Sequence, residues 1–530
     1  MDQPDILFIV LDTQRADRLG CYGHQKAITP NLDKFAAAGV LFEQALSPAQ
    51  WTIPSHASMF TGLYPTAHQV TQSSQSLSAE RPHLAEVLRD VGYQTVAFCN
   101  NPLVGILNNG FKRGFQTFYN YGGAFPSMPS DSTSLPRPLR RLVESYTQFL
   151  RRISYPIQNF FGQSDLAFRL SLNAWFTPIW SRVANFKGQN ERSVRDLTHF
   201  LEEREEKDGE RPLFLFLNLM ETHLPFTPPA EYIDKLAPYL RNSQEARTIM
   251  RRWNREAYRW AAPLAEPLGE LEARVLSDLY DAEVAYQDAY LGQLLDLLSS
   301  RANAENTLTI IVADHGDGLG EHGYMGHAFV AYQELLHVPL LMQWPRQFAE
   351  PARIQTPVST RRVFHTMLDA AGRLPQSATA LDPVQIHGLT LTHTVAGRDP
   401  ERGIVYSEVY PPLTFVKAIE KRQPQLLEDF RCLAVRRSVV QQVGGEGDAA
   451  TPHKLIQVDE KLDEFFNLGD DPLESENLLA KRPSLVEPMH KEMKRIETAV
   501  GQQKTQVKAG SQIEIDENMT QRLRALGYID

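Results

Sequence analysis

Two carboxylates and an imidazole follow apolar runs that have the length of buried strands. Asp12 comes directly after Ile6–Leu11, and Asp314 and His315 come shortly after Leu308–Val312. Carboxylate oxygens and imidazole nitrogens bind Mg, Mn, Ca or Zn. An Asp-His pair alone is more often structural, but the glycines and histidines that follow this pair are typical of a loop over a site. The pattern therefore predicts one divalent metal ion held by these residues.

A second candidate segment runs from Trp51 to Gly62. Thr52 and Pro54 stand before apolar residues there, which predicts a rigid turn and the start of a helix. A hydroxyl at such a start is commonly an N-cap. The free N–H groups of a helix start also attract the oxygens of a phosphate or sulfate. The residues alone leave both interpretations open.

These residues need a scaffold, and the sequence predicts an α/β fold with a largely parallel sheet. Ligands bind such sheets at the carboxyl ends of the strands, where Asp12, His223 and the Asp314-His315 pair stand. The expected strands are Ile6–Leu11, Thr95–Phe98, Leu213–Leu219, Leu308–Val312 and Val338–Met342. The expected helices are Asn31–Ala38, Leu84–Val91, Ser193–Glu203 and Leu276–Leu298.

The chain divides into two predicted parts. Residues 1–400 form the α/β domain with all of the candidate residues, and insertions are expected at about 122–190 and 235–271. These insertions mix arginines with aromatic residues. We interpret them as helices packed over the sheet; the alternative is a lid that recognises an anionic, lipid-like substrate or contacts a membrane surface. Residues 401–530 form a C-terminal subdomain with a helical tail and a small antiparallel sheet, whose expected strands are Ile404–Ser407, Cys432–Arg436, Lys454–Val458 and Glu464–Asn467.

Composition excludes some classes of partner. The 530 residues carry a formal net charge of -10, which argues against a nucleic-acid binder but not against a small anionic ligand beside a metal. The three cysteines lie far apart in the sequence, which argues against a disulfide framework. No apolar stretch approaches the roughly 20 residues that span a bilayer, and the first run is too short for a signal peptide. We therefore expect a cytoplasmic protein with no transmembrane segment; the sequence does not indicate its oligomeric state.

Together these segments resemble the sulfatase family of the alkaline phosphatase superfamily, and within it the phosphonate monoester hydrolase and phosphodiesterase branch. Several motifs in the family's order carry this resemblance over nearly the whole chain. It implies an alkaline-phosphatase-like α/β/α sandwich, with 1–400 as the catalytic domain of a metal-dependent ester hydrolase. The motifs are Leu11–Asp17, Thr29–Asp33, Thr52–Pro65, Gly92–Thr95, Asp314–Gly316, Phe466–Leu468, Asp471–Glu474 and Asn477–Leu478.

The resemblance implies roles at the metal. Asp12, Asp314 and His315 match metal ligands, and Thr52 stands at the position of the nucleophile, which also touches the metal. Thr13 replaces a further metal-binding Asp of many relatives, so one ligand is missing. One metal ion is the leading hypothesis. A second stays open, with ordinary surface or supporting positions favoured for its candidate ligands His322, His337 and His68.

The resemblance also implies residues that face the substrate. His327 replaces a lysine of relatives, and His56 replaces an arginine; both are expected to stabilise ester oxygens. His223 matches a histidine near the leaving group and is the expected acid and base. Asn100 and Asn101 occupy the region of a second substrate-facing lysine.

Position 52 departs from the family pattern. Common sulfatases oxidise a Cys or Ser there to formylglycine, but threonine yields no aldehyde because its β-carbon bears a methyl group. A phosphothreonine can be resolved by attack of water at phosphorus, whereas a sulfated threonine lacks the aldehyde route. We therefore expect hydrolysis of a phosphate ester, with a phosphodiester or phosphonate monoester favoured, through covalent Thr52. Alternatives are a sulfatase that uses Thr52 directly, a phospho-group transferase and a non-catalytic binding protein.

Overall fold

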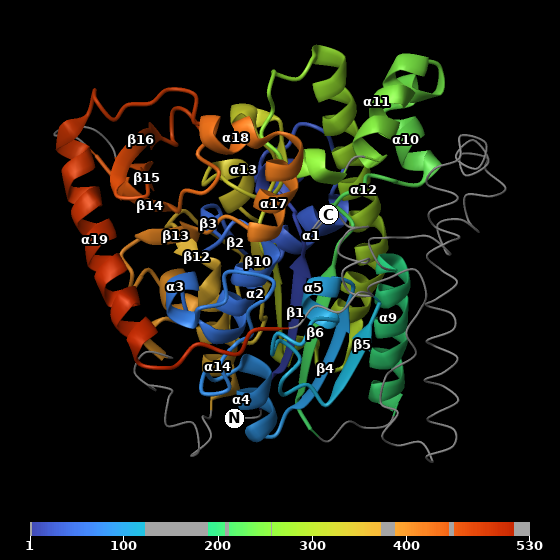
Figure 1. Ribbon diagram of the computed structural model, residues 1–530. Coiled ribbons are helices and arrows are strands. Elements are labelled where there is room, and N and C mark those ends of the chain that lie inside the picture. Colours follow the sequence, from blue (N-terminus) through green and yellow to red (C-terminus); the bar gives the residue numbers. More distant parts are fainter. Residues whose placement is uncertain are drawn as a thin grey trace.

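The computed structural model of the chain (Figure 1) describes residues 3–121, 189–206, 211–255, 257–372, 387–444 and 450–513. The predicted insertion at 122–190 lies outside the described residues except for its last two. The described part contains an eight-stranded sheet, a four-stranded sheet and two short two-stranded pairs. Helices cover both faces of the larger sheet.

In the eight-stranded sheet, one strand runs against the others. β1 (Asp5–Leu11) lies between β6 (Leu213–Leu219) and β7 (Thr307–Val312) and is parallel to both. β10 (Leu340–Gln343) is antiparallel to its two neighbours, β7 and β2. The expected largely parallel sheet is thus confirmed. Its order is β11-β2-β10-β7-β1-β6-β4-β5, with β2 at Val40–Phe42, β4 at Gln94–Cys99, β5 at Thr117–Asn120 and β11 at Ala352–Ile354.

Two apolar cores lie on opposite faces of this sheet, because successive side chains of a strand point to opposite sides. Phe8 and Val10 of β1 belong to one core, and Leu7 and Ile9 belong to the other. The result is the predicted α/β/α sandwich (Figure 1). The first core is covered by α2 (Thr52–Thr61), α4 (Leu84–Asp90), α5 (Pro102–Gly105) and α14 (Val363–Ala371), and the second by α1 (Pro30–Ala37), α9 (Asn190–Glu206) and α12 (Glu270–Ser300).

The predicted small antiparallel sheet at the C-terminus is confirmed. Its order is β13 (Val405–Val409), β14 (Arg436–Val443), β15 (Thr451–Val458) and β16 (Lys461–Asn467). α19 (Pro483–Thr505) packs on it through Met489 and Met493. The strand expected at Cys432–Arg436 starts only at Arg436, because the Cys432 N–H still donates to the Leu427 carbonyl near the end of α18 (Pro424–Asp429). The domain division at residue 400 stays a prediction.

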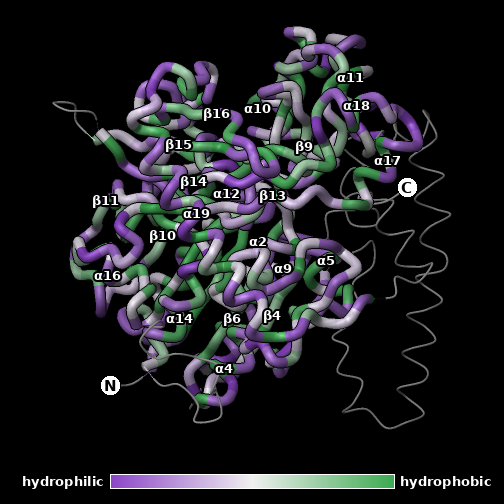
Figure 2. The backbone as a smooth tube through the Cα atoms, turned by 60° about the vertical axis from the view of Figure 1, so that its left-hand side comes forward, coloured by the Kyte–Doolittle hydropathy of each residue, from purple (hydrophilic) through white to green (hydrophobic). Residues whose placement is uncertain are grey.

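The second predicted insertion, at 235–271, contains helices. It spans the end of α10 (Ala230–Leu236), η4 (Pro238–Arg241), α11 (Gln244–Arg255) and η5 (Ala257–Trp260). Trp253 is buried and meets Trp260 edge-on, with ring centres 5.4 Å apart. Figure 2 shows hydrophobic segments along strands of the central sheet such as β4 and β6, whose side chains are mostly buried. Within the described ranges, no helix is both long and apolar enough to cross a membrane.

Short elements connect these layers. They are η1 (Ala16–Arg18), η2 (Gly20–Tyr22), β3 (Ala45–Leu46), α3 (Pro65–His68), η6 (Ala304–Asn306), β8 (Gly318–Leu319), η7 (Glu321–Gly323), β9 (Met325–Gly326), α13 (Gln333–Leu336), β12 (Val358–Ser359), η8 (Thr360–Arg362), α16 (Leu391–Val395), α17 (Leu413–Arg422) and α18 (Pro424–Asp429).

Candidate metal-binding and active site

The structure brings Asp12, Asp314 and His315 together at the carboxyl end of the central sheet. Asp12 follows β1, and the other two residues follow β7, which pairs with β1 in parallel register. One ligand atom from each residue lies within 4.8 Å of the other two, and all three side chains are buried. The neighbouring strand ends therefore bring three candidate metal-ligand residues into one compact group, which we call the ligand group.

The carboxylates of this group have the properties that a cation requires. Asp12 Oδ1 and Asp314 Oδ2 are buried and have no hydrogen-bond partner among the described residues. Burial and the nearby Asp314 carboxylate raise the pKa of Asp12 well above its ordinary value. Two buried carboxylates with unpaired oxygens are unfavourable unless a positive charge lies between them. The donor set of Asp12, Asp314 and His315 thus fits a divalent metal ion.

Asp314 is held in place by hydroxyl and amide donors. The hydroxyls of Ser47 and Ser55 donate to its carbonyl oxygen at 2.5 and 2.7 Å. The backbone N–H groups of Thr13 and His315 donate to its Oδ1 at 3.2 and 2.9 Å. The serine bonds hold the backbone of Asp314, and the amide bonds hold Oδ1 and leave Oδ2 without a hydrogen-bond partner among the described residues.

Thr13 braces the end of β1. Its hydroxyl donates to the Asp12 carbonyl at 2.6 Å, and the Tyr280 hydroxyl donates to the Thr13 carbonyl at 2.6 Å. The φ angle of Thr13 is 60°, a left-handed conformation that is rare for a β-branched residue. Its hydroxyl hydrogen thus bonds to backbone at the position where many relatives have another metal ligand.

Thr52 is the first residue of α2, and Trp51 is the N-cap of that helix. The interpretation of Thr52 as an N-cap is therefore wrong. Its hydroxyl oxygen is buried and lies 3.3 Å from Nε2 of His315. A hydroxyl thus stands beside the ligand group and at the positive end of the helix dipole.

His223 and His327 join His315 in a cluster of imidazoles. The ring centres of His223 and His327 are 5.3 Å apart, and those of His315 and His327 are 4.6 Å apart. Burial and the neighbouring His327 ring lower the pKa of His223 to about 3. Burial lowers the pKa values of His315 and His327 to about 4. These rings are therefore neutral at neutral pH until an anion or a proton donor reaches them.

His56 lies beneath the ligand group. Its Nδ1 is 3.0 Å from the Thr52 carbonyl and 3.3 Å from Asp314 Oδ2, and its Nε2 is 3.4 Å from the side-chain nitrogen of Asn218. The ring is fully buried, with the ring of Phe216 edge-on beside it. Both nitrogens face protein groups, so the expected contact of His56 with ester oxygens is corrected to a supporting position under Asp314 and α2.

The two asparagines expected in the substrate-facing region, Asn100 and Asn101, point in different directions. Asn101 donates from its side chain to Asp12 Oδ2 at 2.5 Å and therefore supports a metal ligand. Asn100 donates to the Ser193 hydroxyl at 2.8 Å and to the Asn218 carbonyl at 2.9 Å. The prediction that Asn100 faces the substrate is corrected, because its amide group ties β4 to α9.

Two site residues were absent from the sequence predictions. The side-chain oxygen of Asn218 accepts from the Asn101 N–H at 3.0 Å, and Asp317 Oδ1 lies 2.9 Å from Nδ1 of His327. Burial raises the pKa of Asp317 to about 7. A signal existed for Asn218, which is the polar residue inside the apolar run Leu213–Leu219.

The histidines considered for a second metal ion bond elsewhere. Nδ1 of His322 lies 2.9 Å from Glu334 Oε1, and Nε2 of His337 lies 2.8 Å from the Glu43 carbonyl. His68 accepts from the Val70 N–H and lies 3.1 Å from the Ser58 hydroxyl. Each of these rings thus contacts protein groups, and the second metal ion stays a hypothesis.

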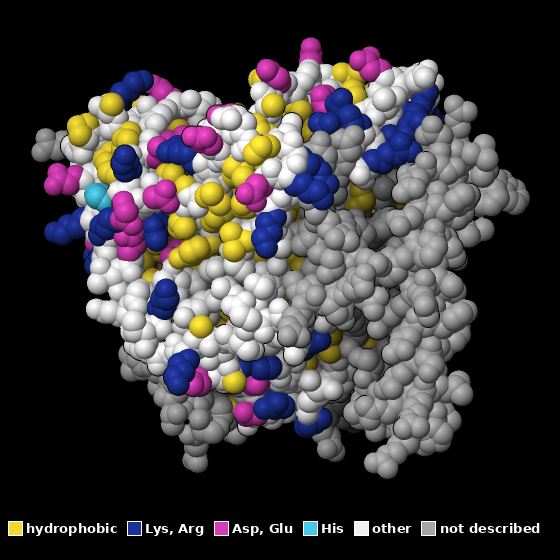
Figure 3. Space-filling view, viewed as in Figure 1, with side chains coloured by type: hydrophobic (Ala, Val, Ile, Leu, Met, Phe, Trp, Pro, Cys, Tyr) yellow, Lys and Arg dark blue, Asp and Glu magenta, His cyan; other side chains and the backbone are white. Residues whose placement is uncertain are grey.

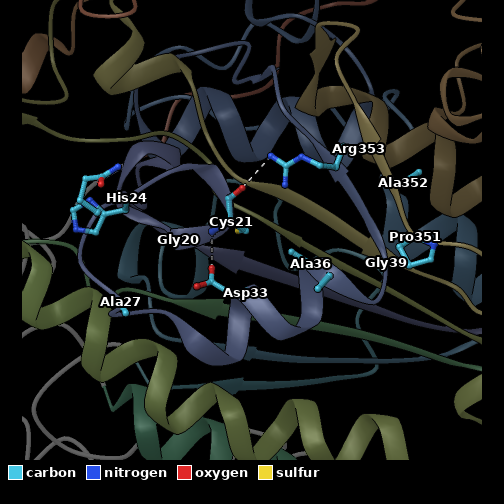
Figure 4. A pocket seen from close by; sticks show the side chains of 12 residues that line it. Gly20, Cys21, His24, Ala27, Asp33, Ala36, Gly39, Pro351, Ala352 and Arg353 are labelled. Atoms are coloured by element: carbon cyan, nitrogen blue, oxygen red, sulfur yellow. Dashed lines mark hydrogen bonds between the residues drawn. The ribbon is translucent and has the colours of Figure 1, made fainter.

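A separate pocket of about 570 Å³ lies between η2, α1 and β11 (Figure 4). Arg353 donates there to the Cys21 carbonyl at 3.1 Å, and the Cys21 N–H donates to Asp33 Oδ1 at 2.7 Å. None of the predicted site residues lines it. It is therefore distinct from the candidate site.

Comparisons with known proteins agree with this geometry. The family model described as Sulfatase matches residues 4–373. The chain is 24% identical over 374 residues to the uncharacterized sulfatase YidJ of Escherichia coli (strain K12). This alignment covers 70% of this chain and 68% of that protein. It is 23% identical over 412 residues to an arylsulfatase of Clostridium perfringens, which covers 75% of this chain and 79% of that protein.

Solved structures show the same fold. The phosphonate monoester hydrolase of Agrobacterium radiobacter matches with a TM-score of 0.63 and 18% identity, over 94% of this chain and 96% of that one. The predicted alkaline-phosphatase-like fold is confirmed. The family model covers most of the α/β part, and the ligand group lies at the expected strand ends. The chain therefore belongs to the sulfatase family.

Proposed function

We propose that the protein is a metal-dependent hydrolase that cleaves a phosphate ester through a covalent Thr52 intermediate. The observation that carries the proposal is the position of the Thr52 hydroxyl, at the start of α2 and 3.3 Å from Nε2 of His315. A hydroxyl becomes a nucleophile when neighbouring groups favour its deprotonated form. The residues around Thr52 suit that task.

Asp12, Asp314 and His315 would hold the divalent ion, which is Ca, Mn, Mg or Zn, with the Thr52 oxygen as a further ligand. Such an ion supplies positive charge that lowers the pKa of the hydroxyl and neutralises an ester oxygen. Support comes from the two carboxylate oxygens that are buried without partners among the described residues.

The remaining steps fall to the histidines. Thr52 Oγ1 bonds to phosphorus as the bond to the leaving oxygen breaks, and the hydroxyl proton passes to Nε2 of His327. His223 gives a proton to the leaving oxygen; the charge of a bound anionic ester offsets the burial that lowers its pKa. Water then attacks the phosphothreonine and gives a proton to His223, and Thr52 recovers its proton from His327.

A sulfate ester is the second candidate substrate, because the named relatives include sulfatases. Threonine still favours phosphorus. A sulfated threonine would need direct attack of water at sulfur or carbon, whereas phosphothreonine is resolved by in-line attack at phosphorus.

One substrate panel distinguishes these candidates. Aryl sulfate, phosphomonoester, phosphodiester and phosphonate monoester substrates are compared on the metal-loaded wild type and on Thr52→Ala. We expect the highest kcat/KM for a phosphodiester or phosphonate monoester, and phosphate on Thr52 by mass spectrometry after rapid quenching. Fastest turnover of the aryl sulfate would establish the sulfatase instead. Esters of added alcohols among the products would indicate a transferase, and absence of turnover across the panel a binding protein.

For the substrate itself we propose a small or lipid-like anionic ester. Lys and Arg side chains gather near α11 on the face in Figure 3, beside hydrophobic side chains. Such a face suits an anionic surface with an apolar layer. Co-sedimentation with vesicles that contain anionic lipid, at low salt and against neutral vesicles, tests this proposal; equal recovery of the protein with both vesicles would refute it.

A further inference from the structure

A hairpin places Asp317 beside His327. β8 and β9 pair in antiparallel register, with Gly318 opposite Gly326, so the next pair outward is Asp317 and His327. Asp317 Oδ1 and His327 Nδ1 are 2.9 Å apart, and both side chains are buried. The contact is therefore built into the loop that follows the metal-ligand residues.

The neighbouring cation Arg15 forms no ion pair with the Asp317 carboxylate. Arg15 donates to the backbone carbonyl of Asp317 at 3.1 Å and directs its charge to Asp17 and Glu321. Asp317 Oδ2 has no hydrogen-bond partner in the described ranges. The imidazole of His327 is thus the hydrogen-bond partner of this carboxylate among the described side chains.

We infer that Asp317 is a positioning residue, which holds the proton of His327 on Nδ1 and so leaves Nε2 as the proton-accepting nitrogen toward the reacting groups. In its ionised form the Asp317 carboxylate accepts only, and it then selects the tautomer in which Nδ1 carries the hydrogen. His327 Nε2 is buried and lacks a hydrogen-bond partner within the described residues, and its ring adjoins His315 and His223. The inference rests on the proposed function, in which His327 accepts the Thr52 proton.

Asp317→Asn is the decisive substitution, because it keeps the size of the side chain. Its amide can turn the NH2 group toward Nδ1 and so favour the opposite tautomer, with the hydrogen on Nε2. We expect kcat to fall by about 10²-fold or more while KM changes less than about threefold. His327→Gln should show a similar loss. The double variant should be no slower than His327→Gln alone, because both changes remove the same function.

The matched control is Glu321→Gln, in the same loop. Glu321 accepts from Arg15 and from the Leu319 N–H rather than from an imidazole, so kcat should stay within about threefold of wild type. Equal metal content and thermal unfolding temperatures for Asp317→Asn and wild type show that the fold is intact. Losses that multiply in the double variant would overturn the inference, because Asp317 would then act elsewhere.

A spectroscopic readout separates this inference from the proposed function. Nitrogen-15 NMR of histidine-labelled, metal-loaded protein, with His327→Gln used to assign the signal, should show Nδ1 protonated in the wild type and Nε2 protonated in Asp317→Asn. An unchanged tautomer would overturn the role of Asp317 whatever the activity shows. If Thr52→Ala keeps full activity, the proposed function fails, but the tautomer result still stands.

Discussion

The hydroxyl oxygen of Thr52 lies 3.3 Å from Nε2 of His315, although 263 positions separate the two residues in the sequence. A hydrogen bond between their two segments holds these residues close to each other. Ser55, one helical turn beyond Thr52, donates to the Asp314 carbonyl at 2.7 Å. The helix with the hydroxyl is therefore bonded to the strand end with the candidate ligands, and this bond helps to set the distance between the Thr52 hydroxyl and the ligand group.

Removal of the Thr52 hydroxyl should abolish turnover without unfolding the protein. Thr52→Ala should lower kcat by about 10³-fold or more, because the attacking oxygen is gone. Thr52→Ser should keep activity within about 30-fold of wild type. Steady-state kinetics on the best substrate of the panel measure both. Thr61→Ala, which removes a hydroxyl bonded to the Ala57 carbonyl on the same helix, is the control. A Thr52→Ala variant with a tenth of wild-type activity would contradict the nucleophile.

Loss of one carboxylate should stabilise the metal-free protein and weaken the metal-loaded one. The folded state raises the pKa of Asp12 above its unfolded value of 3.8, so ionisation of Asp12 costs stability as the pH rises past that value. At pH 7.5, Asp12→Asn should therefore raise the Tm of protein treated with a chelator. Metal affinity should fall at least about tenfold because one ligand is lost.

Thermal unfolding after dialysis against a chelator, followed by titration with manganese, tests this reversal. Wild type should gain Tm as metal is added, because binding to the folded state alone stabilises it. A lower Tm of the metal-free Asp12→Asn variant would contradict a stability cost of ionising Asp12.

His322 should make stability fall in alkaline solution. Burial alone would lower the pKa of His322. The hydrogen bond and charge of Glu334, together with the nearby Glu474 carboxylate, outweigh burial and raise this pKa to about 9. A raised folded pKa gives stability that is complete below the unfolded value of 6.5 and is lost as the pH rises through about 9. The upper limit of this contribution is roughly 3 kcal/mol.

The free energy of unfolding by urea, measured from pH 6 to 10, tests this titration. His322→Gln should flatten the loss between pH 6.5 and 9. His199→Gln, at a histidine with 69% of its side chain exposed on α9, should follow the wild-type curve. Parallel curves for His322→Gln and wild type would show that His322 does not couple to folding.

A buried ion pair joins β15 of the C-terminal sheet to the loop that follows β16. Lys454 Nζ lies 2.9 Å from Glu474 Oε1, and both side chains are fully buried. Lys454→Met should lower the free energy of unfolding by about 3–5 kcal/mol, because it leaves Glu474 buried without its cation. Lys454→Met with Glu474→Leu should recover most of that loss.

The exposed pair of Lys481 and Glu476 is the matched comparison. Lys481→Met should change the free energy of unfolding by less than about 1 kcal/mol, because water screens an exposed pair. Urea unfolding measures all of these variants. Equal losses from Lys454→Met and Lys481→Met would show that burial adds nothing to the pair.

Much of the fold follows from local pattern alone. The strand predicted at Leu213–Leu219 matches β6, because a buried parallel strand has an uninterrupted apolar run. β2 and β11 escaped prediction because strands of three residues have no detectable periodicity. They exist through their pairing at the edge of the sheet, which is a tertiary property.

The sequence by itself determined which strand ends carry ligands, because Asp12 and the Asp314-His315 pair stand directly behind apolar runs that must be buried. Only the tertiary structure decided where the other side chains point. Asn100 and Asn101 are adjacent, yet one bonds to α9 and the other to Asp12. His56 turns inward because its helix packs against the distant strand end that carries Asp314, and Asp317 meets His327 through the register of a hairpin.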